Sequence, residues 1–464
     1  MHDFLRMVLN MLGSGIGLAL IAIGMGALAL FIIFVIYKKK KKDKKFPWKK
    51  AFVILLLVGY FAVLLYATLL RMGGVGFRGS NFHLFRAWRE AWNNYSLQNW
   101  LNILLNVAMF MPLGFLLPCI IKQFQKWYLM FATGFATSLC IEIIQYTTGR
   151  GLFDVDDLFA NTIGVMLGYC VIQFLVFVLK KDSRKKCIRY VVFPTVFAAV
   201  LIGIFVKYQV QEYGNLPEAP VMTANVKGIE WNLECELSRN EKTVPTYSIV
   251  PYRKEDADAF AEEFAQMMGV EFPDASYYDS SAIYQNHSTG DFLYVKYFDR
   301  SYEHTVGDVD FLLSDIEVDE ACIREMLKPY KIEIPEGAEF AYEGNGRHKV
   351  TVRMVENGDA LIDGTIVCYV KEGEQLQKLN NYLTTYSTYS EVVIISEEAA
   401  YQQLCSGRFY GSDWIEHSKP DIISISSCEL EYRVDTKGFY QPVYVFEASM
   451  DGSDTGTIVI PAMK

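Results

Sequence analysis

The sequence predicts an α-helical multi-pass membrane bundle followed by an α+β extracytoplasmic domain. The first observation is hydropathy: 52% of the 464 residues are hydrophobic, and uncharged runs of about 20 residues, enough to span a bilayer, recur in residues 1–207. The second observation is charge: residues 1–207 contain 24 Lys/Arg and 8 Asp/Glu, whereas residues 208–464 contain 20 and 45. A basic, apolar half joined to an acidic, mixed half indicates a membrane module linked to a soluble domain. The acidic soluble half also argues against nucleic acid as a partner.

Three domains follow from these patterns. Residues 1–50 hold an extra transmembrane helix and a Lys-rich cytoplasmic connection, residues 51–207 form the main transmembrane domain, and residues 208–464 form the acidic extracytoplasmic domain. The first helix lies in the charge-free run Met7–Tyr37. This run is too long for the apolar part of a signal peptide, and the heavy positive charge follows it, so a retained helix is expected.

Five further spans are expected downstream of the Lys-rich connection. They are Ala51–Leu70, Leu101–Ile121, Trp127–Tyr146, Leu158–Leu179 and Tyr190–Val206. The span Leu101–Ile121 contains Pro112 and Gly114, which predict a break, and Pro118, which predicts its end. Residues 72–98 contain four glycines in their first part and are expected to form a loop.

The Lys-rich connections predict the orientation in the membrane. Cytoplasmic loops carry an excess of Lys and Arg. Lys38–Lys50, Lys122 with Lys126, and Lys180–Lys186 all fall on one side when the six spans alternate. That side is therefore cytoplasmic, and both termini are expected to be extracytoplasmic in a multi-pass protein of the cell membrane.

The second half reads as helices alternating with strands. Helical periodicity marks Asp256–Met268 and Glu397–Leu404. Strand patterns mark Phe292–Phe298, Lys349–Val355, Thr365–Val370, Leu430–Val434, Val443–Ala448 and Thr457–Ile460. This order favours an α+β fold, with two related subdomains as a possible arrangement.

Histidines and cysteines give no sign of a metal site or of catalysis in the soluble half. His287, His304, His348 and His417 are scattered without catalytic spacing, so surface or loop positions are expected for them. The nine cysteines include no CxxC pair, and five of them, widely spaced, follow residue 208. No metal, no cofactor and no disulfide framework are expected, although one or two disulfide bridges are compatible with the sequence.

Polar residues gather in and beside the apolar spans, where they are costly unless paired or hydrated. Ser138, Glu142 and Gln145 are spaced by four and three, so they share one helix face. Asp157 and Asn161 follow the same spacing with Gly164 and Gly168, and those glycines let another backbone approach closely. The alternative is that such groups only join helices by hydrogen bonds, and Asp157 is equally suited to capping its helix.

Arginines near the same outer ends complete a predicted binding site. Arg150 lies between two spans and is expected to pair with Glu142 or Asp157, and Arg71 ends the preceding span. Carboxylates, arginines and amides at this depth suit a phosphate, a carboxylate or a zwitterionic head group. The candidate binding residues are Arg71, Asn106, Ser138, Glu142, Gln145, Arg150, Asp157 and Asn161.

The order and spacing of these residues resemble those of the VanZ-like family over about Val53–Val178. The pattern N-x5-P-x-G begins at Asn106, S-x3-E-x2-Q at Ser138, and R-x6-D-x3-N-x2-G-x3-G at Arg150. The resemblance implies a bacterial envelope membrane protein with a role in low-level glycopeptide resistance, chiefly to teicoplanin. The chain departs from the family by its extra first helix and its large acidic domain.

The end of the chain resembles extracytoplasmic domains of the YycH/YycI type. Those domains have a helix before a short sheet with a G-x3-P-x-Y-x-F strand, which matches Gly438, Pro442, Tyr444 and Phe446. The resemblance implies protein binding without an enzyme site. The alternative is a strand pattern common to many α+β domains, because short motifs have many chance matches.

Three functions are compatible with these observations. The first is a non-enzymatic envelope protein that binds an amphiphile or envelope-precursor head group in the outer leaflet. The second is a membrane enzyme acting on a lipid-linked envelope precursor, with Glu142 or Asp157 as general acid or base and arginines on the phosphate. The third is a sensor or scaffold whose outer domain recruits a protein. His2 and His83 are the only histidines before residue 208, so no second base is evident and an enzyme is disfavoured.

Overall fold

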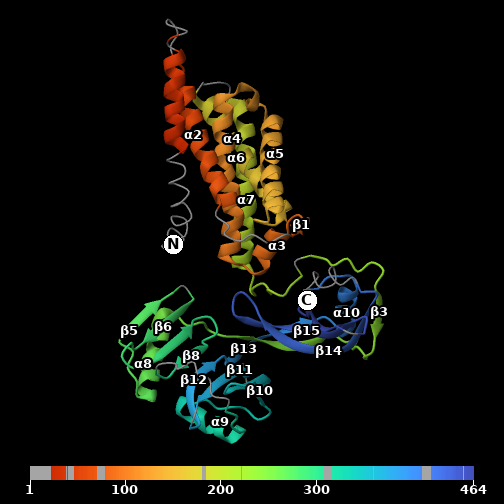
Figure 1. Cartoon of the computed structure of the whole chain (residues 1–464). Coiled ribbons are helices and arrows are strands. Elements are labelled where there is room, and N and C mark those ends of the chain that lie inside the picture. Colours follow the sequence, from red (N-terminus) through yellow and green to blue (C-terminus); the bar gives the residue numbers. More distant parts are fainter. Residues whose placement is uncertain are drawn as a thin grey trace. The chain divides into compact units, whose positions relative to one another are not determined.

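The chain divides into two compact units, Met1–Glu212 and Tyr213–Lys464, in a computed structural model (Figure 1). The structure describes residues 22–37, 39, 46–70, 79–179, 184–220, 222–278, 280–307, 316–358, 360–371, 373–409, 420–452 and 454–464. Arg71, His417 and the first part of the expected first span lie outside the described residues. Each unit is described by itself below.

Five helices of the first unit are long and apolar enough to cross a membrane, among the residues that the structure describes. They are α2 (Trp48–Leu65, continued by the π-helix η1, Tyr66–Leu70), α4 (Leu97–Ile120), α5 (Trp127–Thr148), α6 (Val155–Leu179) and α7 (Arg184–Val210). The described part of the first predicted span is a shorter apolar helix, Ala22–Tyr37. With the sheet-rich second unit, these helices confirm the predicted fold class.

Two expectations about the third span and its preceding loop are wrong. α4 runs without interruption through Pro112 and Pro118, because neighbouring helices in a membrane can satisfy the backbone groups that proline frees. Within the expected loop 72–98, β1 (Ser80–Asn81) pairs in parallel with β2 (Phe153–Asp154), and α3 (Arg86–Asn93) forms a short helix. α3 has one strongly polar side and one apolar side. Ala91 is the one fully buried residue of this helix.

Glycines bring α4 and α6 into backbone contact, as the spacing on α6 predicted. A Cβ atom on Gly164 would lie 2.0 Å from the carbonyl oxygen of Val107, and one on Gly168 would lie 1.9 Å from that of Met111. Gly114 of α4 makes the reciprocal approach, since its Cβ would lie 1.9 Å from the Val165 oxygen. The two helices can therefore pack this closely only because these three positions lack side chains.

α6 is the central helix of the first unit. It packs against α4, α5 and α7, and half of its most apolar stretch is buried within the protein, whereas none of the most apolar stretch of α7 is. The core between α2, α4, α5 and α6 contains Leu64, Phe110, Met130 and Val165, each at most 1% exposed. Figure 1 shows these helices side by side with similar axes. The position of α6 makes its polar side chains internal to the bundle.

The second unit is built on a network of fourteen strands. Its strands are β3 (Glu230–Leu233), β4 (Lys242–Ser248), β5 (Asp274–Tyr277), β6 (Ser281–Gln285), β7 (Phe292–Lys296), β8 (Tyr302–Thr305), β9 (Glu339–Tyr342), β10 (Arg347–Asn357), β11 (Ala360–Lys371), β12 (Gln375–Asn381), β13 (Thr384–Ile394), β14 (Ile422–Val434), β15 (Phe439–Met450) and β16 (Asp454–Pro461). The strand order is β3-β14-β15-β4-β13-β11-β12-β8-β7-β6-β5, with β10 and β9 joined to β11, and β16 joined to β15. Nearly all pairs are antiparallel, and β14 with β3 is parallel.

The two largest hydrophobic cores of this unit lie on the network, beside two smaller clusters. α8 (Lys254–Met268) and α9 (Glu320–Leu327) cover β6, β7, β8 and their neighbours, and Phe264 and Leu327 are fully buried there. α10 (Glu397–Cys405) packs with β14, β15 and β16 around Phe446 and Ile460. The predicted helices and strands of this half are confirmed, and most of them extend further at one or both ends; β7 instead ends at Lys296, two residues before the predicted end at Phe298. The predicted elements do not include α9 or the strands β3, β4, β5, β6, β8, β9, β12 and β13.

Two of the histidines are buried, which corrects their expected surface positions. His304 on β8 is 1% exposed, and its Nδ1 lies 2.9 Å from the Tyr330 hydroxyl. His348 on β10 is 5% exposed, and its Nε2 donates to the Ile316 carbonyl at 3.0 Å. Both lie on strands whose alternate residues face a core, so their inward direction follows from strand register. His287 is exposed, as expected. All nine cysteines are free thiols.

Candidate functional site

Most of the predicted site residues meet where α4, α5 and α6 face one another. We define the polar cluster as Asn106 of α4, Ser138 and Glu142 of α5, Asp154 just before α6, and Asp157 and Asn161 of α6. The four- and three-residue spacings on α5 and α6 bring these side chains onto facing surfaces, one helix turn apart. The cluster is therefore stacked in two layers along α6.

The outer layer contains two carboxylates bonded to neutral donors. Glu142 is 2% exposed, and its Oε2 accepts the backbone N–H of Asp154 at 2.9 Å. Asp157 accepts a hydrogen bond from the Asn106 amide at 2.5 Å. Each bond satisfies one oxygen of its carboxylate but supplies no full positive charge. Glu142 lies six residues before the end of α5, which places it about 9 Å from that helix end.

The inner layer contains an amide that is only partly satisfied. Asn161 donates its Nδ2 to the Ser138 hydroxyl at 2.9 Å, and both residues are buried. The other end of the amide, Asn161 Oδ1, is buried and has no hydrogen-bond partner among the described residues. A buried acceptor without a donor costs free energy, on the order of 1–3 kcal/mol. This oxygen is therefore available to a donor that enters the cluster.

The side chains of Gln145 and Arg150 bond to η1 and not to the polar cluster. The amide of Gln145 donates to the Thr68 carbonyl at 3.0 Å, and the Arg150 guanidinium donates to the Leu69 carbonyl at 2.7 Å. These carbonyls lie at the end of η1, where backbone oxygens lack partners within the helix and positive charge is favourable. The expected pairing of Arg150 with Glu142 or Asp157 is wrong, because no ion pair joins them in the described structure.

The start of α6 contains two further carboxylates that the predicted binding set omitted. Asp154 accepts from the Asp156 backbone N–H at 2.8 Å, so Asp154 caps α6 and not Asp157. Asp156 reaches back to α3 and accepts from the backbone N–H groups of Phe85 at 2.5 Å and Ala87 at 2.7 Å. The sequence signal was Asp-x-Asp at a helix start, but the partner of Asp156 lies about 70 residues earlier.

The clustered carboxylates have little counter-charge in the described structure, where the Arg86 guanidinium attracts Asp154 without forming an ion pair. Within the part of the chain that the structure describes, no Lys or Arg forms an ion pair with Glu142, Asp154, Asp156 or Asp157. Burial raises the pKa of the Asp154 carboxyl above its ordinary value. No group of three or more His, Cys, Asp or Glu side chains among the described residues has the arrangement of a metal site. The geometry therefore suits an incoming group that carries positive charge and hydrogen-bond donors.

An apolar groove lies on the opposite face of α6. It has a volume of about 500 Å³, and its lining includes Leu84, Phe135, Phe159, Met166 and Phe193. Its α6 residues follow a helical stripe that is turned away from Asp157 and Asn161. The groove and the polar cluster are therefore separate features of the bundle.

The membrane unit contains a region that is similar to a known protein family. Residues 51–178 match the VanZ/LLP1 family. This range contains every described residue of the predicted binding set and ends at the last turn of α6. A comparison with curated proteins found no match.

Two solved structures align weakly with the chain. An uncharacterized protein from Eubacterium rectale has 12% identity, covers 50% of this chain and 86% of its own, and gives a TM-score of 0.25. The Bacillus megaterium YpeB C-terminal domain has 12% identity, covers 46% of this chain and 94% of its own, and gives a TM-score of 0.22. At these TM-scores neither alignment establishes a shared fold, so the resemblance to YycH/YycI-type domains stays a prediction.

Proposed function

Because residues 51–178 form a VanZ/LLP1 domain of a multi-pass membrane protein, we propose that its polar cluster binds the head group of an envelope amphiphile or envelope precursor. The head group enters from the outer leaflet and brings a cationic nitrogen. This assignment rests on the burial and hydrogen bonds of the cluster residues. It refines the range of head groups that the sequence allowed, from anionic or zwitterionic to amine-bearing.

The observation that carries the proposal is the charge balance of the outer layer. Glu142 is almost completely buried, yet its one described hydrogen-bond donor is a backbone N–H. Asp157 has an amide as its donor. Burying a carboxylate is costly unless a counter-charge or several donors stabilise it. An ammonium group between the two carboxylates would supply charge and three donors.

The inner layer adds a hydrogen-bonding requirement. Asn161 Oδ1 is an acceptor without a donor, one helix turn from Asp157. An amine or hydroxyl of the head group would satisfy it. A purely anionic phosphate would instead bring further negative charge beside Glu142 and Asp157, at a Coulombic cost.

The test is lipid retention by the intact protein. The full chain is purified in nanodiscs that contain phosphatidylethanolamine and phosphatidylglycerol, and retained lipids are counted by native mass spectrometry. We expect the amine-bearing lipid to be enriched on the wild type. Glu142→Gln and Asp157→Asn should each lower that enrichment about fivefold, because each variant removes one carboxylate whose attraction to the amine contributes about 1 kcal/mol to binding.

The matched control is Glu90→Gln, which makes the same chemical change on the exposed carboxylate of α3. It should retain lipids as the wild type does. Equal retention by Glu142→Gln, or a preference for phosphatidylglycerol that Glu142→Gln leaves unchanged, would refute a cationic head group as the ligand. Accumulation of a chemically altered lipid-linked precursor in cells with Glu142→Gln would favour the membrane-enzyme alternative.

The cellular role that we propose is a contribution to glycopeptide resistance of the teicoplanin type. Expression in a susceptible bacterium should raise the inhibitory concentration of teicoplanin, Glu142→Gln should abolish that rise at equal protein level, and Glu90→Gln should preserve it. If the Glu142→Gln variant still raises the inhibitory concentration of teicoplanin, resistance does not depend on the polar cluster.

A further inference from the structure

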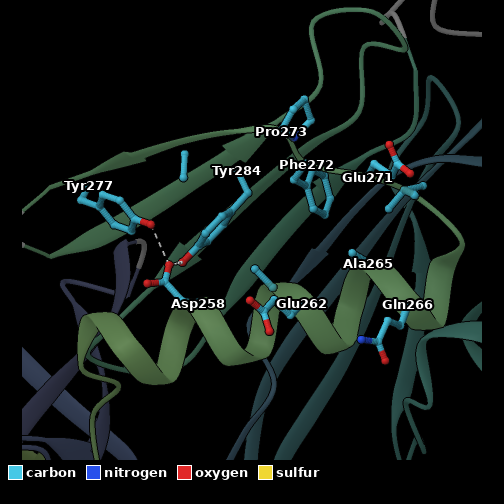
Figure 2. Close-up of a pocket in the computed structure, with 12 residues that line it drawn as sticks. Asp258, Glu262, Ala265, Gln266, Glu271, Phe272, Pro273, Tyr277 and Tyr284 are labelled. Atoms are coloured by element: carbon cyan, nitrogen blue, oxygen red, sulfur yellow. Dashed lines mark hydrogen bonds between the residues drawn. The ribbon is translucent and has the colours of Figure 1, made fainter.

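A groove of about 600 Å³ runs between α8 and the edge strand β5 in the second unit. Figure 2 shows α8 along one side, with Asp258 reaching toward Tyr277 and Tyr284, and Phe272 and Pro273 on the other side; Glu262 and Gln266 of α8 also line the groove. The groove belongs to the soluble unit alone. It is independent of the polar cluster and of the function proposed above.

The strand that borders the groove has a free edge. β5 is the last strand in the sheet order and pairs only with β6 within the described residues. The Tyr278 N–H donates to the Ser281 carbonyl, and hydrogen-bonded pairs alternate along antiparallel strands. Ala275 and Tyr277 therefore direct their backbone N–H and C=O groups away from β6. Both residues also line the groove.

The groove is acidic along its walls and apolar between them. Its described lining includes the carboxylates of Asp258, Glu262 and Glu271 and no Lys, Arg or His. Tyr277 and Tyr284 both donate their hydroxyls to Asp258 Oδ1, at 2.9 and 2.8 Å, which fixes that carboxylate at one end. The Nζ of Lys254 lies 3.7 Å from the Tyr277 ring centre, so this ring face already accommodates a cation.

We propose that this groove binds an extended, basic segment of a partner protein, which adds to β5 as a further strand. The free N–H and C=O groups of Ala275 and Tyr277 pair with the main chain of the segment, and alternate side chains enter the groove. Lys and Arg fit those positions, because their aliphatic stems lie on Ala261, Ala265 and Phe272 while their charges reach the carboxylates.

The length of β5 sets the size of the contact. Its four residues span about 13 Å at 3.3 Å per residue, so about two outward N–H/C=O pairs and two groove-facing side chains of the partner are involved. Such a contact is short, and its specificity comes from combining strand pairing with charge. A partner that has only one of these properties should bind poorly.

The test uses the full chain in phosphatidylcholine nanodiscs, whose zwitterionic surface does not attract basic peptides electrostatically. The probe is a fluorescent seven-residue peptide that alternates Lys and Thr. Two comparison peptides replace Lys by Glu, or carry N-methyl groups on alternate backbone nitrogens in either register. We expect binding of the Lys peptide, measured by fluorescence anisotropy, and at least about tenfold weaker binding of both comparison peptides.

Variants separate the two parts of the proposal. Ala275→Pro removes an outward N–H that β6 does not use, a change that edge strands tolerate, and it should weaken binding of the Lys peptide about tenfold by blocking the strand contact. Glu262→Gln should weaken binding about threefold, as expected for an exposed ion pair. Its matched control is Glu263→Gln, the next residue on α8, which lies toward Lys331 and outside the groove lining.

Several results would overturn the proposal. Equal binding of the Lys, Glu and N-methylated peptides would do so, as would wild-type affinity in both Ala275→Pro and Glu262→Gln. If Ala275→Pro fails to fold, the comparison of Glu262→Gln with Glu263→Gln still decides whether the groove recognises charge. A wild-type dimer that Ala275→Pro converts to a monomer would assign the β5 edge to a second copy of the chain and would also overturn it.

Discussion

Replacing Gly164 by alanine tests the packing of α4 against α6. The new Cβ would lie 2.0 Å from the Val107 carbonyl oxygen and 3.2 Å from the Phe110 Cβ. A real Cβ needs about 3.2 Å from such an oxygen, so the helices must separate by about 1 Å, and overpacking of this kind costs roughly 1–3 kcal/mol. Helix propensity works in the opposite direction by about 1 kcal/mol. Because the clash is with a backbone oxygen that cannot rotate away, the overpacking cost should lie near the upper end of that range, about 3 kcal/mol, and we expect a net loss of about 2 kcal/mol.

Gly168 allows a second, sharper comparison. It lies one turn along α6 and would place its Cβ 1.9 Å from the Met111 oxygen. Once one alanine has separated the helices, the second meets a wider gap, so the double variant should lose clearly less than the sum of the two single losses. The matched control is Gly203→Ala on α7, which has nothing within 4 Å and should be neutral or stabilising.

Unfolding of the full chain in mixed micelles of increasing SDS content measures these changes. Tryptophan fluorescence reports mainly on the first unit, which contains five of the seven tryptophans. A Gly164→Ala variant as stable as the wild type, or a Gly203→Ala variant as unstable as Gly164→Ala, would refute the close backbone approach. Strict additivity in the double variant would refute the shared interface.

Three further predictions concern the orientation in the membrane, the pH dependence of stability, and the independent folding of the second unit. Cysteine labelling in intact cells should find positions 40 and 185 inside and position 300 outside, which would confirm both termini as extracytoplasmic; the opposite pattern would overturn the orientation. Burial lowers the pKa of His304 from 6.5 to about 4, so the unfolded state takes up the proton first, and stability should fall as the pH drops from 6.5 to 4, by about 3 kcal/mol in total. His304→Gln should remove that part of the pH dependence, as measured by urea unfolding of the second unit, and an unchanged profile would contradict it. A fragment beginning at Gln211 should be soluble and give a cooperative thermal transition by circular dichroism, because its two cores are internal to residues 213–464; a fragment that needs detergent would contradict this.

The membrane helices and their polar faces could be predicted because both depend on local spacing. A run of 20 apolar residues identifies a span, and intervals of three and four residues place Ser138 with Glu142 and Asp157 with Asn161. The same rule placed Gly164 and Gly168 against another backbone, and the structure confirms that contact. Such inferences need no knowledge of which helix is the neighbour.

The errors arose where a residue's partner is distant in the chain. Arg150 lies beside two carboxylates in the sequence, but its guanidinium bonds to a carbonyl 81 residues earlier, at the end of η1. α3 falls in a predicted loop because it is short and its N-terminal cap, Asp156, comes from another helix. His304 faces inward because of strand register, which a single polar residue in a short strand does not reveal.

Residues 150–156, which run from the end of α5 into the first turn of α6, connect three helix ends. Arg150 bonds to the last turn of η1, Asp154 caps α6, and Asp156 bonds to the first backbone N–H groups of α3. The Asp154 N–H also bonds to Glu142 inside the polar cluster. A ligand that draws Glu142 away from Asp154 would therefore shift a segment that is bonded to the ends of η1, α3 and α6, and these helix ends would move together. Ligand binding at a small buried site would in this way displace several helix ends together at the membrane surface.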